Sequence, residues 1–261
     1  MTSVVPDILA RIVARKRAEL RQTAAQRDSL ERQAEERTAA RRDFAGALRR
    51  PAPAIIAEIK RASPSKGLLS EDFAPGRIAS AYEQGGAAAL SVLTDRHYFQ
   101  GSLHDLAEAR AAVSLAALRK DFTIDPLQVI ETAAGGADAV LLIAAILTTR
   151  EMRDLRELAE TYRMAALVEV HEDVELASAV DSGARIIGVN NRNLHTFEVR
   201  LETSIELAGM MPGGVTRVAE SGIRSRADIE RLRLAGFDAF LVGEHLMKSG
   251  DPAAALRELR A

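Results

Sequence analysis

The 261-residue sequence contains no cysteine. This absence excludes disulfide bonds, thiolate metal sites and a cysteine nucleophile, and it fits the reducing conditions of the cytosol. Neither sign of charge is in clear excess, because 35 Lys and Arg residues stand against 37 Asp and Glu residues, a formal net charge of −2. Such a chain has no general attraction for nucleic acid or for an anionic membrane, so an anionic ligand must be held by a local site.

Long apolar runs are absent as well. No run approaches the roughly 20 residues of a membrane-spanning helix, and residues 1–10 lack the basic stretch and apolar stretch of a secretion signal. Hydrophobic residues still make up 47% of the chain and charged residues 28%, which is enough for a large core and a solvated surface. We therefore expect a cytoplasmic protein that has neither a membrane nor a nucleic acid as a partner.

Residues 1–50 differ in amino-acid composition from the rest of the chain. They are rich in Ala, Arg, Glu and Leu and poor in β-branched residues, which favours helix. Ile8, Ile12 and Val13 fall at helical spacing and predict a stripe that packs on the main body. Residues 24–41 are almost wholly polar and predict a more loosely held helix or connector, with most arginines in solvent. We interpret 1–50 as an N-terminal helical extension.

Residues 51–261 contain short apolar runs that alternate with helical stretches, the pattern of repeated βα units. Parallel strands buried on both faces read as continuous apolar runs. Eight units of this spacing favour a closed (β/α)8 TIM barrel of the α/β class over an open sheet, with 51–261 as the catalytic domain. The runs are AIIAEI (54–59), AALSVL (88–93), AALRK (116–120), DAVLLIA (138–144), AALVEV (165–170), RIIGVN (185–190), TRVAE (216–220) and DAFLVG (238–243).

Polar residues interrupt these runs where the strands end. Active sites of α/β barrels lie at the carboxyl ends of the strands, so the residues there are candidates for catalysis. Any one of them taken alone fits a structural ion pair, but so many charges on one rim are costly to desolvate for stability only. The catalytic candidates are Glu58, Lys60, Lys120, Glu169, Asn190, Glu220 and Ser221.

A second group of residues is typical of a phosphate site. Ser63 begins the stretch Ser-Pro-Ser-Lys-Gly after the first strand, Gly222 follows the seventh, and Gly243 and Glu244 follow the eighth. Loops after the last two strands commonly bind phosphate through backbone N–H groups. The glycines also fit ordinary tight turns. For Glu244 we expect the backbone amide to bind while the carboxylate points away.

The sequence stretches at these positions resemble the indole-3-glycerol-phosphate synthase family, in the family's order and over nearly the whole chain. They are IIAEIKRASPSKG, ALSVLTDRHYFQGS, LRKDFTID, LVEVH, IIGVNNRNL, VAESGI and FLVGEHLM, after an N-terminal ILARIVARKRAEL. The resemblance implies a carboxy-lyase of tryptophan biosynthesis. Its substrate would be the sugar phosphate 1-(2-carboxyphenylamino)-1-deoxyribulose 5-phosphate, and it would need no cofactor and no metal. All the catalytic candidates match the family's active-site positions, and Ser63, Gly222 and Gly243 match its phosphate contacts.

The reaction implied by the resemblance assigns the lysines different tasks. Ring closure places negative charge on the ribulose carbonyl oxygen, and we expect Lys120 to protonate it as general acid, with its pKa lowered by burial and by Lys60. Lys60 is expected to bind the substrate carboxylate. Glu58 is expected to stabilise the cation at the anilino nitrogen.

The later steps need a base and an acid after carbon dioxide leaves. Glu169 and one of the two lysines fit these roles, and the sequence does not decide which lysine acts in dehydration. Asn190 and Glu220 suit substrate hydroxyls and lysine orientation, and Ser221 suits the anthranilate end. Phe122, Leu142 and Leu194 are candidates for packing against the aromatic ring, or ordinary core residues.

Other functions remain open at this point. Phosphoribosylanthranilate isomerase is a related barrel, but its family uses a cysteine base. A Schiff-base aldolase would use Lys120 as nucleophile, and borohydride trapping would detect it. A barrel that binds a phosphometabolite without turnover would be expected to have lost some of these charges. We expect a monomer or weak homodimer, with possible contact to other enzymes of the tryptophan pathway through the N-terminal helix.

Overall fold

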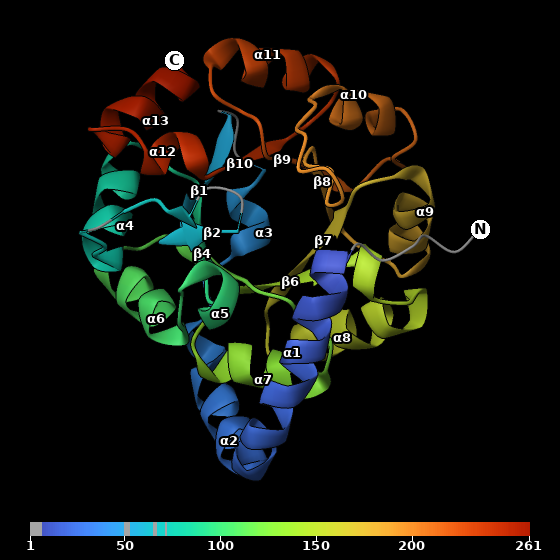
Figure 1. Ribbon diagram of the computed structural model, residues 1–261. Coiled ribbons are helices and arrows are strands. Elements are labelled where there is room, and N and C mark those ends of the chain that lie inside the picture. The colour runs from blue at the N-terminus through green and yellow to red at the C-terminus, as the bar shows by residue number, and fades with distance from the viewer. Residues whose placement is uncertain (1–6, 50–52, 65–66, 71) are drawn as a thin grey trace.

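The computed structural model describes residues 7–49, 53–64, 67–70 and 72–261. Eight parallel strands close into a barrel in the order β1-β10-β9-β8-β7-β6-β5-β4, and β4 pairs with β1 (Figure 1). All eight predicted apolar runs form strands, with ends that differ by at most one residue, so the predicted TIM barrel is confirmed. The strands are β1 (Ala54–Ile59), β4 (Ala89–Leu93), β5 (Ala116–Lys120), β6 (Ala139–Ile143), β7 (Ala165–Val170), β8 (Ile186–Asn190), β9 (Thr216–Glu220) and β10 (Ala239–Val242).

The strands are mostly apolar because both of their faces are buried. Alternate residues fill the barrel, among them Ile56, Leu118 and Leu141. Their neighbours, such as Ile55 and Leu142, pack outward against the helices. This alternation decides which side chain at each strand end faces the mouth of the barrel.

Helices form a ring around the barrel (Figure 1). Several begin at a Ser, Thr or Asp whose side chain accepts a hydrogen bond from a first-turn N–H group, as at Ser102, Asp125 and Thr148. Two short helices, α5 (Arg96–Phe99) and α12 (Glu244–Met247), and the hairpin β2 (Ala62–Ser63) and β3 (Gly67–Leu68) lie in the connections. The helices of the ring are α4 (Pro75–Gln84), α6 (Leu103–Ala112), α7 (Pro126–Ala134), α8 (Thr149–Thr161), α9 (Asp173–Asp181), α10 (Glu202–Ala208), α11 (Arg226–Leu234) and α13 (Pro252–Arg260).

The N-terminal segment is helical, as predicted. It comprises α1 (Asp7–Thr23), α2 (Arg27–Arg37) and α3 (Phe44–Ala47), with 3-10 turns at Ala24–Gln26 and Thr38–Ala40. The buried face of α1 carries Leu9, Ile12 and Lys16, whereas Ile8 and Val13 are half-buried. A buried stripe on this helix is therefore present and includes Ile12 as predicted, but its other members are Leu9 and Lys16. Helix α2 packs beside α7 and buries Ala34 completely (Figure 1).

Two arginines that follow α2 depart from the prediction of a solvated face. Arg41 donates hydrogen bonds to the carbonyl oxygens of Ala133, Ala137 and Tyr162 at 2.6, 2.8 and 3.2 Å. Arg42 likewise donates to the carbonyl of Leu115 at 2.6 Å. These bonds fasten the extension to the amino end of the barrel, where orphan carbonyls at helix and loop ends need donors. Among the described residues no helix is both long and apolar enough to cross a membrane.

Candidate active site

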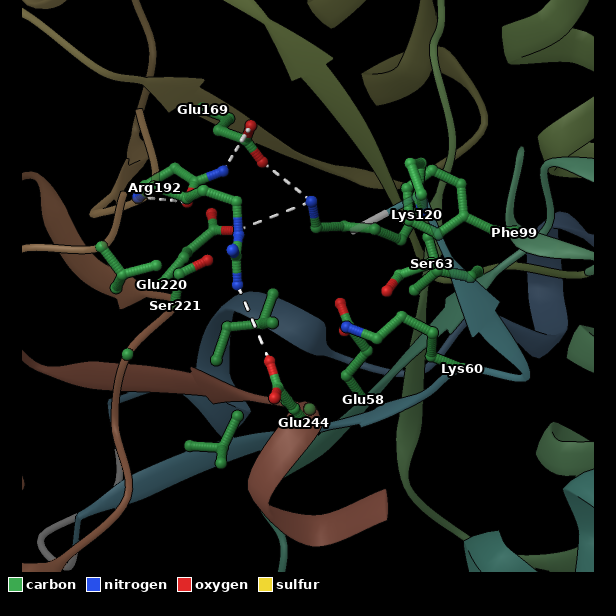
Figure 2. Close-up of a pocket in the computed structure, with 18 of the residues that line it drawn as sticks. Glu58, Lys60, Ser63, Phe99, Lys120, Glu169, Arg192, Glu220, Ser221 and Glu244 are labelled. Carbon is green, nitrogen blue, oxygen red and sulfur yellow. Dashed lines mark hydrogen bonds and ion pairs between the residues drawn. The ribbon is translucent and has the colours of Figure 1, made fainter. Parts of the chain in front are cut away.

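A cavity of about 680 Å³ opens at the carboxyl end of the barrel. Its floor is made of strand-end side chains and its walls of the loops that follow the strands, as Figure 2 shows for the charged groups. Every candidate site residue lines this one cavity: Glu58, Lys60, Ser63, Lys120, Glu169, Asn190, Glu220, Ser221, Gly222, Gly243 and Glu244. The sequence prediction that these residues converge is thus met by the geometry.

Lys120 extends from the end of β5 into a group of carboxylates. Its Nζ lies 2.8 Å from Glu169 Oε2 and 3.7 Å from Glu220 Oε2. Burial alone would lower the pKa of Lys120, but Glu169, Glu220 and Glu58 outweigh it and raise that pKa above its ordinary value. The expectation of a lowered pKa is therefore wrong, because the nearby charges that dominate are negative.

Lys60 does not supply the repulsion that was expected. Its Nζ donates a 2.6 Å hydrogen bond to Glu58 Oε1, and both side chains are largely buried. The two residues are spaced by two along the chain, so they lie on the same side, as the strand period predicts. Each lysine is thus paired with a carboxylate of its own.

Glu169 is held from three directions at the end of β7. Besides Lys120, Asn190 Nδ2 donates to its Oε1 at 3.1 Å, and His171 Nε2 lies 3.4 Å from the same oxygen. Nδ1 of His171 lies 3.0 Å from Glu175 Oε2. Burial would lower the pKa of His171, but Glu169 and Glu175 raise it to about 10, so the ring is an imidazolium at neutral pH.

Sequence reasoning missed His171. The signal was present, because His171 follows Glu169 by two residues just as Lys60 follows Glu58, and so shares its side of the strand. The pKa of Glu169 moves the opposite way from that of His171. Burial would raise it, but Lys120 and His171 hold it below its ordinary value, so Glu169 is a carboxylate.

Glu220 at the end of β9 has a different environment. Its buried Oε1 accepts no hydrogen bond from any described residue. Burial and then the neighbouring charge of Glu169 raise the pKa of Glu220 to about 8, so the group keeps a proton at neutral pH. The room for it comes from Gly188 on β8, where an added Cβ would collide with the Glu220 carboxylate. Two glutamates in one cavity therefore differ in protonation.

The other side of the cavity is built from tight loops. Ser221 and Gly222 both have positive φ, 66° and 85°, which turns the chain sharply after β9. Gly243 packs against Glu58, and an added Cβ there would collide with the carboxylate. Glu244 does not turn its carboxylate away as expected. It pairs with Lys248 at 2.7 Å and lies 3.8 Å from Arg192 Nη2, across the mouth (Figure 2).

Several lining residues were not predicted. Arg192 enters from the loop after β8 and is anchored through a bond from Nη1 to the carbonyl of Phe197. Phe99 on α5 and the α1 residues Leu9 and Ile12 also line the cavity. Arg192 stands in the quoted stretch IIGVNNRNL, two residues after Asn190, so its spacing offered a signal. The contribution of α1 offered none, because sequence does not say where an extension docks.

The three ring-packing candidates divide. Phe122 and Leu194 line the cavity, whereas Leu142 is fully buried in the layer between β6 and the helices. Its neighbours Leu141 and Ile143 face the cavity instead. Leu142 is therefore an ordinary core residue, the second of the two alternatives, because it lies on the outward-facing phase of the strand's alternation. Among the described residues no group of three or more His, Asp or Glu side chains is arranged to hold a metal ion.

Comparison with protein families connects this geometry to a known group. A sequence model described as indole-3-glycerol phosphate synthase matches residues 9–259. A relative of that name from Albidiferax ferrireducens is 50% identical over 98% of this chain and 98% of its own length. Another, from Leptothrix cholodnii, is 50% identical over 98% of this chain and 99% of its own length. One from Burkholderia vietnamiensis is 48% identical over 97% of this chain and 98% of its own.

Solved structures with the same fold are more distant. Thiamine phosphate pyrophosphorylase from Pyrococcus furiosus superposes with a TM-score of 0.60 at 18% identity, covering 82% of this chain and 96% of that one. The N-acetylmannosamine-6-phosphate 2-epimerase from Clostridium perfringens gives 0.58 at 18% identity, covering 74% and 86%. At these identities the likeness concerns the barrel fold alone.

Proposed function

Because the chain belongs to the indole-3-glycerol phosphate synthase family, we propose that the charged side chains at the carboxyl end of its barrel carry out that family's reaction, with Lys120 as general acid. The protein is a carboxy-lyase of tryptophan biosynthesis. It closes the ring of 1-(2-carboxyphenylamino)-1-deoxyribulose 5-phosphate, releases carbon dioxide and water, and yields indole-3-glycerol phosphate. The assignment of each step to a side chain is the proposal.

Ring closure is assigned to Lys120. As the aromatic carbon bearing the carboxylate attacks the ribulose carbonyl, the carbonyl oxygen becomes an alkoxide. A lysine with a raised pKa stays charged until that moment, so it stabilises the developing negative charge and then gives its proton to the stronger base. The carboxylates around Lys120 hold the ammonium in place. After Lys120 has given up its proton, they relay a new proton to it from solvent.

Lys60 and Glu58 are assigned to the anthranilate end of the substrate. The Lys60 ammonium binds the substrate carboxylate, and the substrate then competes with Glu58 for it. Arg192, on the opposite side of the cavity, supplies a second cation for an anionic group of the substrate. Glu58 is then available to stabilise positive charge at the anilino nitrogen after ring closure.

The last step is assigned to Glu169. Glu169 is ionised, and Asn190 and His171 fix its position. A base that removes the ring proton needs both properties. Glu220 keeps its own proton near neutral pH, which suits hydrogen bonding to a substrate hydroxyl. Either lysine suits the protonation of the departing hydroxyl. Ser221 is assigned to the anthranilate end of the substrate.

Phosphate binding is assigned to the backbone around Ser63, Gly222, Gly243 and the amide of Glu244. Tight turns of this kind commonly present backbone N–H groups to an anion; Ser221 and Gly222 have positive φ, and Gly243 carries no side chain. The Glu244 carboxylate is neutralised by Lys248, which reduces its repulsion of a dianion. The phosphate takes no part in bond changes; it orients the reacting end.

We also propose how the chain is organised and where it works. Residues 1–50 form an extension and residues 51–261 the catalytic barrel, and the extension completes the cavity wall through α1. For its association state we propose a monomer or a weak homodimer. A cytoplasmic location is supported by the cysteine-free composition. A contact with other tryptophan-pathway enzymes would use the exposed side of α1.

The observation that carries the assignment is the position of Lys120 among Glu169, Glu220 and Glu58 in the cavity floor. The test is the growth of indole fluorescence on mixing protein with substrate, for the wild type, Lys120→Met and Lys60→Met. We expect Lys120→Met to lose turnover and Lys60→Met to raise KM. Turnover retained by Lys120→Met would show that Lys120 is not the general acid. A substrate adduct trapped on the wild-type protein by borohydride would show that Lys120 acts as a nucleophile instead.

A further inference from the structure

One buried lysine lies outside the group of side chains described above. Lys16 is on α1, and only 5% of its surface is exposed. Its Nζ lies 2.8 Å from Asp95 Oδ2 and 2.8 Å from Asp121 Oδ1, and 3.4 Å from Glu19 of its own helix. A charge this deeply buried is costly unless it is paired, and here two carboxylates from two different loops pair with it.

Asp95 belongs to the loop after β4. Its Oδ1 accepts a 2.6 Å hydrogen bond from the backbone N–H of Tyr98 and so caps the start of α5. Helix α5 has only four residues and ends at Phe99, whose ring lines the cavity. The orientation of Phe99 therefore depends on how Asp95 is held.

Asp121 belongs to the loop after β5, directly between Lys120 and Phe122. It accepts hydrogen bonds from Thr94 Oγ1 at 2.6 Å, Arg119 Nη2 at 3.1 Å and the N–H of Phe122 at 2.8 Å. Burial alone would raise the pKa of Asp121, but Arg119 and Lys16 lower it to about 2, so the group is a carboxylate. Asp121 thereby fixes the backbone that carries the second aromatic ring.

The two rings meet. The centroids of Phe99 and Phe122 are 6.1 Å apart with an angle of 36° between the ring planes, and both rings line the cavity. On α1 the buried face continues from Lys16 back to Ile12 and Leu9, which line the cavity too. Lys16 thus connects three segments that form one apolar wall of the cavity: α1, the loop after β4 that contains α5, and the loop after β5.

We propose that Lys16 is a positioning residue, which sets the spacing of Phe99 and Phe122 for the aromatic ring of the substrate by binding Asp95 and Asp121 together. The proposal rests on the proposed function for the identity of that ring. The pairs also fit a purely structural ion cluster, which would stabilise the fold without affecting the wall. The two possibilities differ in what happens to Phe99 when the lysine charge is removed.

The chain contains no tryptophan, so Phe99→Trp introduces a single indole as a fluorescent reporter of the wall. In that background, without substrate, Lys16→Met is compared with Arg15→Met. Arg15 is the neighbouring cation on α1, is half exposed, and pairs with Glu19 through an i,i+4 contact. We expect Lys16→Met to shift the emission to longer wavelength and to lower its anisotropy, and Arg15→Met to change neither.

Kinetics on the natural Phe99 chain provide the second reading. We expect Lys16→Met to raise KM on the order of tenfold with a smaller change in kcat, because a displaced apolar wall weakens ring binding. Lys16→Arg, which keeps the charge, is expected to restore part of the affinity. If Lys16→Met does not fold, Asp95→Asn takes its place, since it removes the same bridge at its other end.

Unchanged emission and KM in Lys16→Met, with a lower melting temperature alone, would overturn the proposal and leave a structural ion cluster. A shifted emission with unchanged KM would also overturn it, because the wall would then move without consequence for the substrate. Failure of the proposed function is seen separately, as absence of indole formation by the wild type. The emission comparison is made without substrate and does not depend on that result.

Discussion

Both ends of the barrel hold buried charges, but the two clusters are built differently. At the amino end, Asp138 accepts four hydrogen bonds, from the backbone N–H groups of Arg42 and Ala117 and from Nε and Nη2 of Arg110, all within 3.0 Å. At the carboxyl end, Lys120 is shared unequally between Glu169 and Glu220, and an oxygen of Glu220 has no donor among the described residues.

The difference indicates which cluster stabilises and which reacts. A fully bonded carboxylate such as Asp138 has no capacity left for a ligand, and removing it leaves several donors unpaired. A cluster that faces a cavity and in which one carboxyl group is protonated and another is ionised can form hydrogen bonds with a substrate and transfer protons to or from it. The contrast makes opposite predictions for substitutions at the two ends.

The largest expected effect is at the carboxyl end. Glu169→Gln keeps the shape of the side chain but removes the base, so we expect kcat to fall on the order of 10³-fold. The fold should be retained, which circular dichroism checks. A kcat within threefold of wild type would show that Glu169 is only part of the scaffold.

The matching substitution at the amino end is Asp138→Ala. It leaves Arg110 and two backbone N–H groups without their acceptor, so we expect unfolding free energy to fall by about 3 kcal/mol. Because the site is at the far end of the barrel, kcat should stay near that of the wild type. Urea unfolding and indole formation measure the two quantities. A loss of kcat without a loss of stability would break the comparison.

Glu220→Gln tests the proton on Glu220. Its folded pKa of about 8 exceeds the ordinary 4.5, so the folded state holds a proton that the unfolded state loses. Stability of the wild type therefore falls as pH rises from 4.5 to 8. Glu220→Gln should remove that fall and be more stable than wild type at pH 9, by roughly 1–3 kcal/mol. Parallel stability curves for the two proteins would show that Glu220 is ionised.

His171→Asn has the smallest expected effect. Without the imidazolium, Glu169 loses one cation and takes up a proton at higher pH, so we expect kcat to fall about tenfold and the acid limb of its pH profile to move upward. The folded pKa of His171 is about 10, so its contribution to stability is complete below pH 6.5 and disappears as pH rises through 10. His104→Asn, at an exposed histidine of α6, serves as control and should leave both profiles unchanged.

The sequence predicted the barrel, and the convergence of the candidate residues on one cavity, for physical reasons. Strands buried on both faces must be apolar, so a charge at their ends is conspicuous, and the carboxyl ends of parallel strands meet at one rim. What depends on distances across strands was not predictable. The pKa direction of Lys120 follows from three carboxylates on three other strands. The contacts of Leu9 and Ile12 with the cavity, and of Lys16 with its two carboxylates, follow from where α1 lies. Leu142 stayed open between ring packing and core because a wholly apolar strand does not reveal the phase of its alternation.

The central claim is that Lys120 provides the proton for ring closure, before decarboxylation. The measurement that tests it most directly follows carbon dioxide release and indole formation together in a single turnover, using substrate labelled in the carboxylate. For Lys120→Met we predict the loss of both signals in equal proportion, whereas Glu169→Gln should release carbon dioxide ahead of indole. Carbon dioxide release at the wild-type rate by Lys120→Met, with indole formation abolished, would contradict the claim.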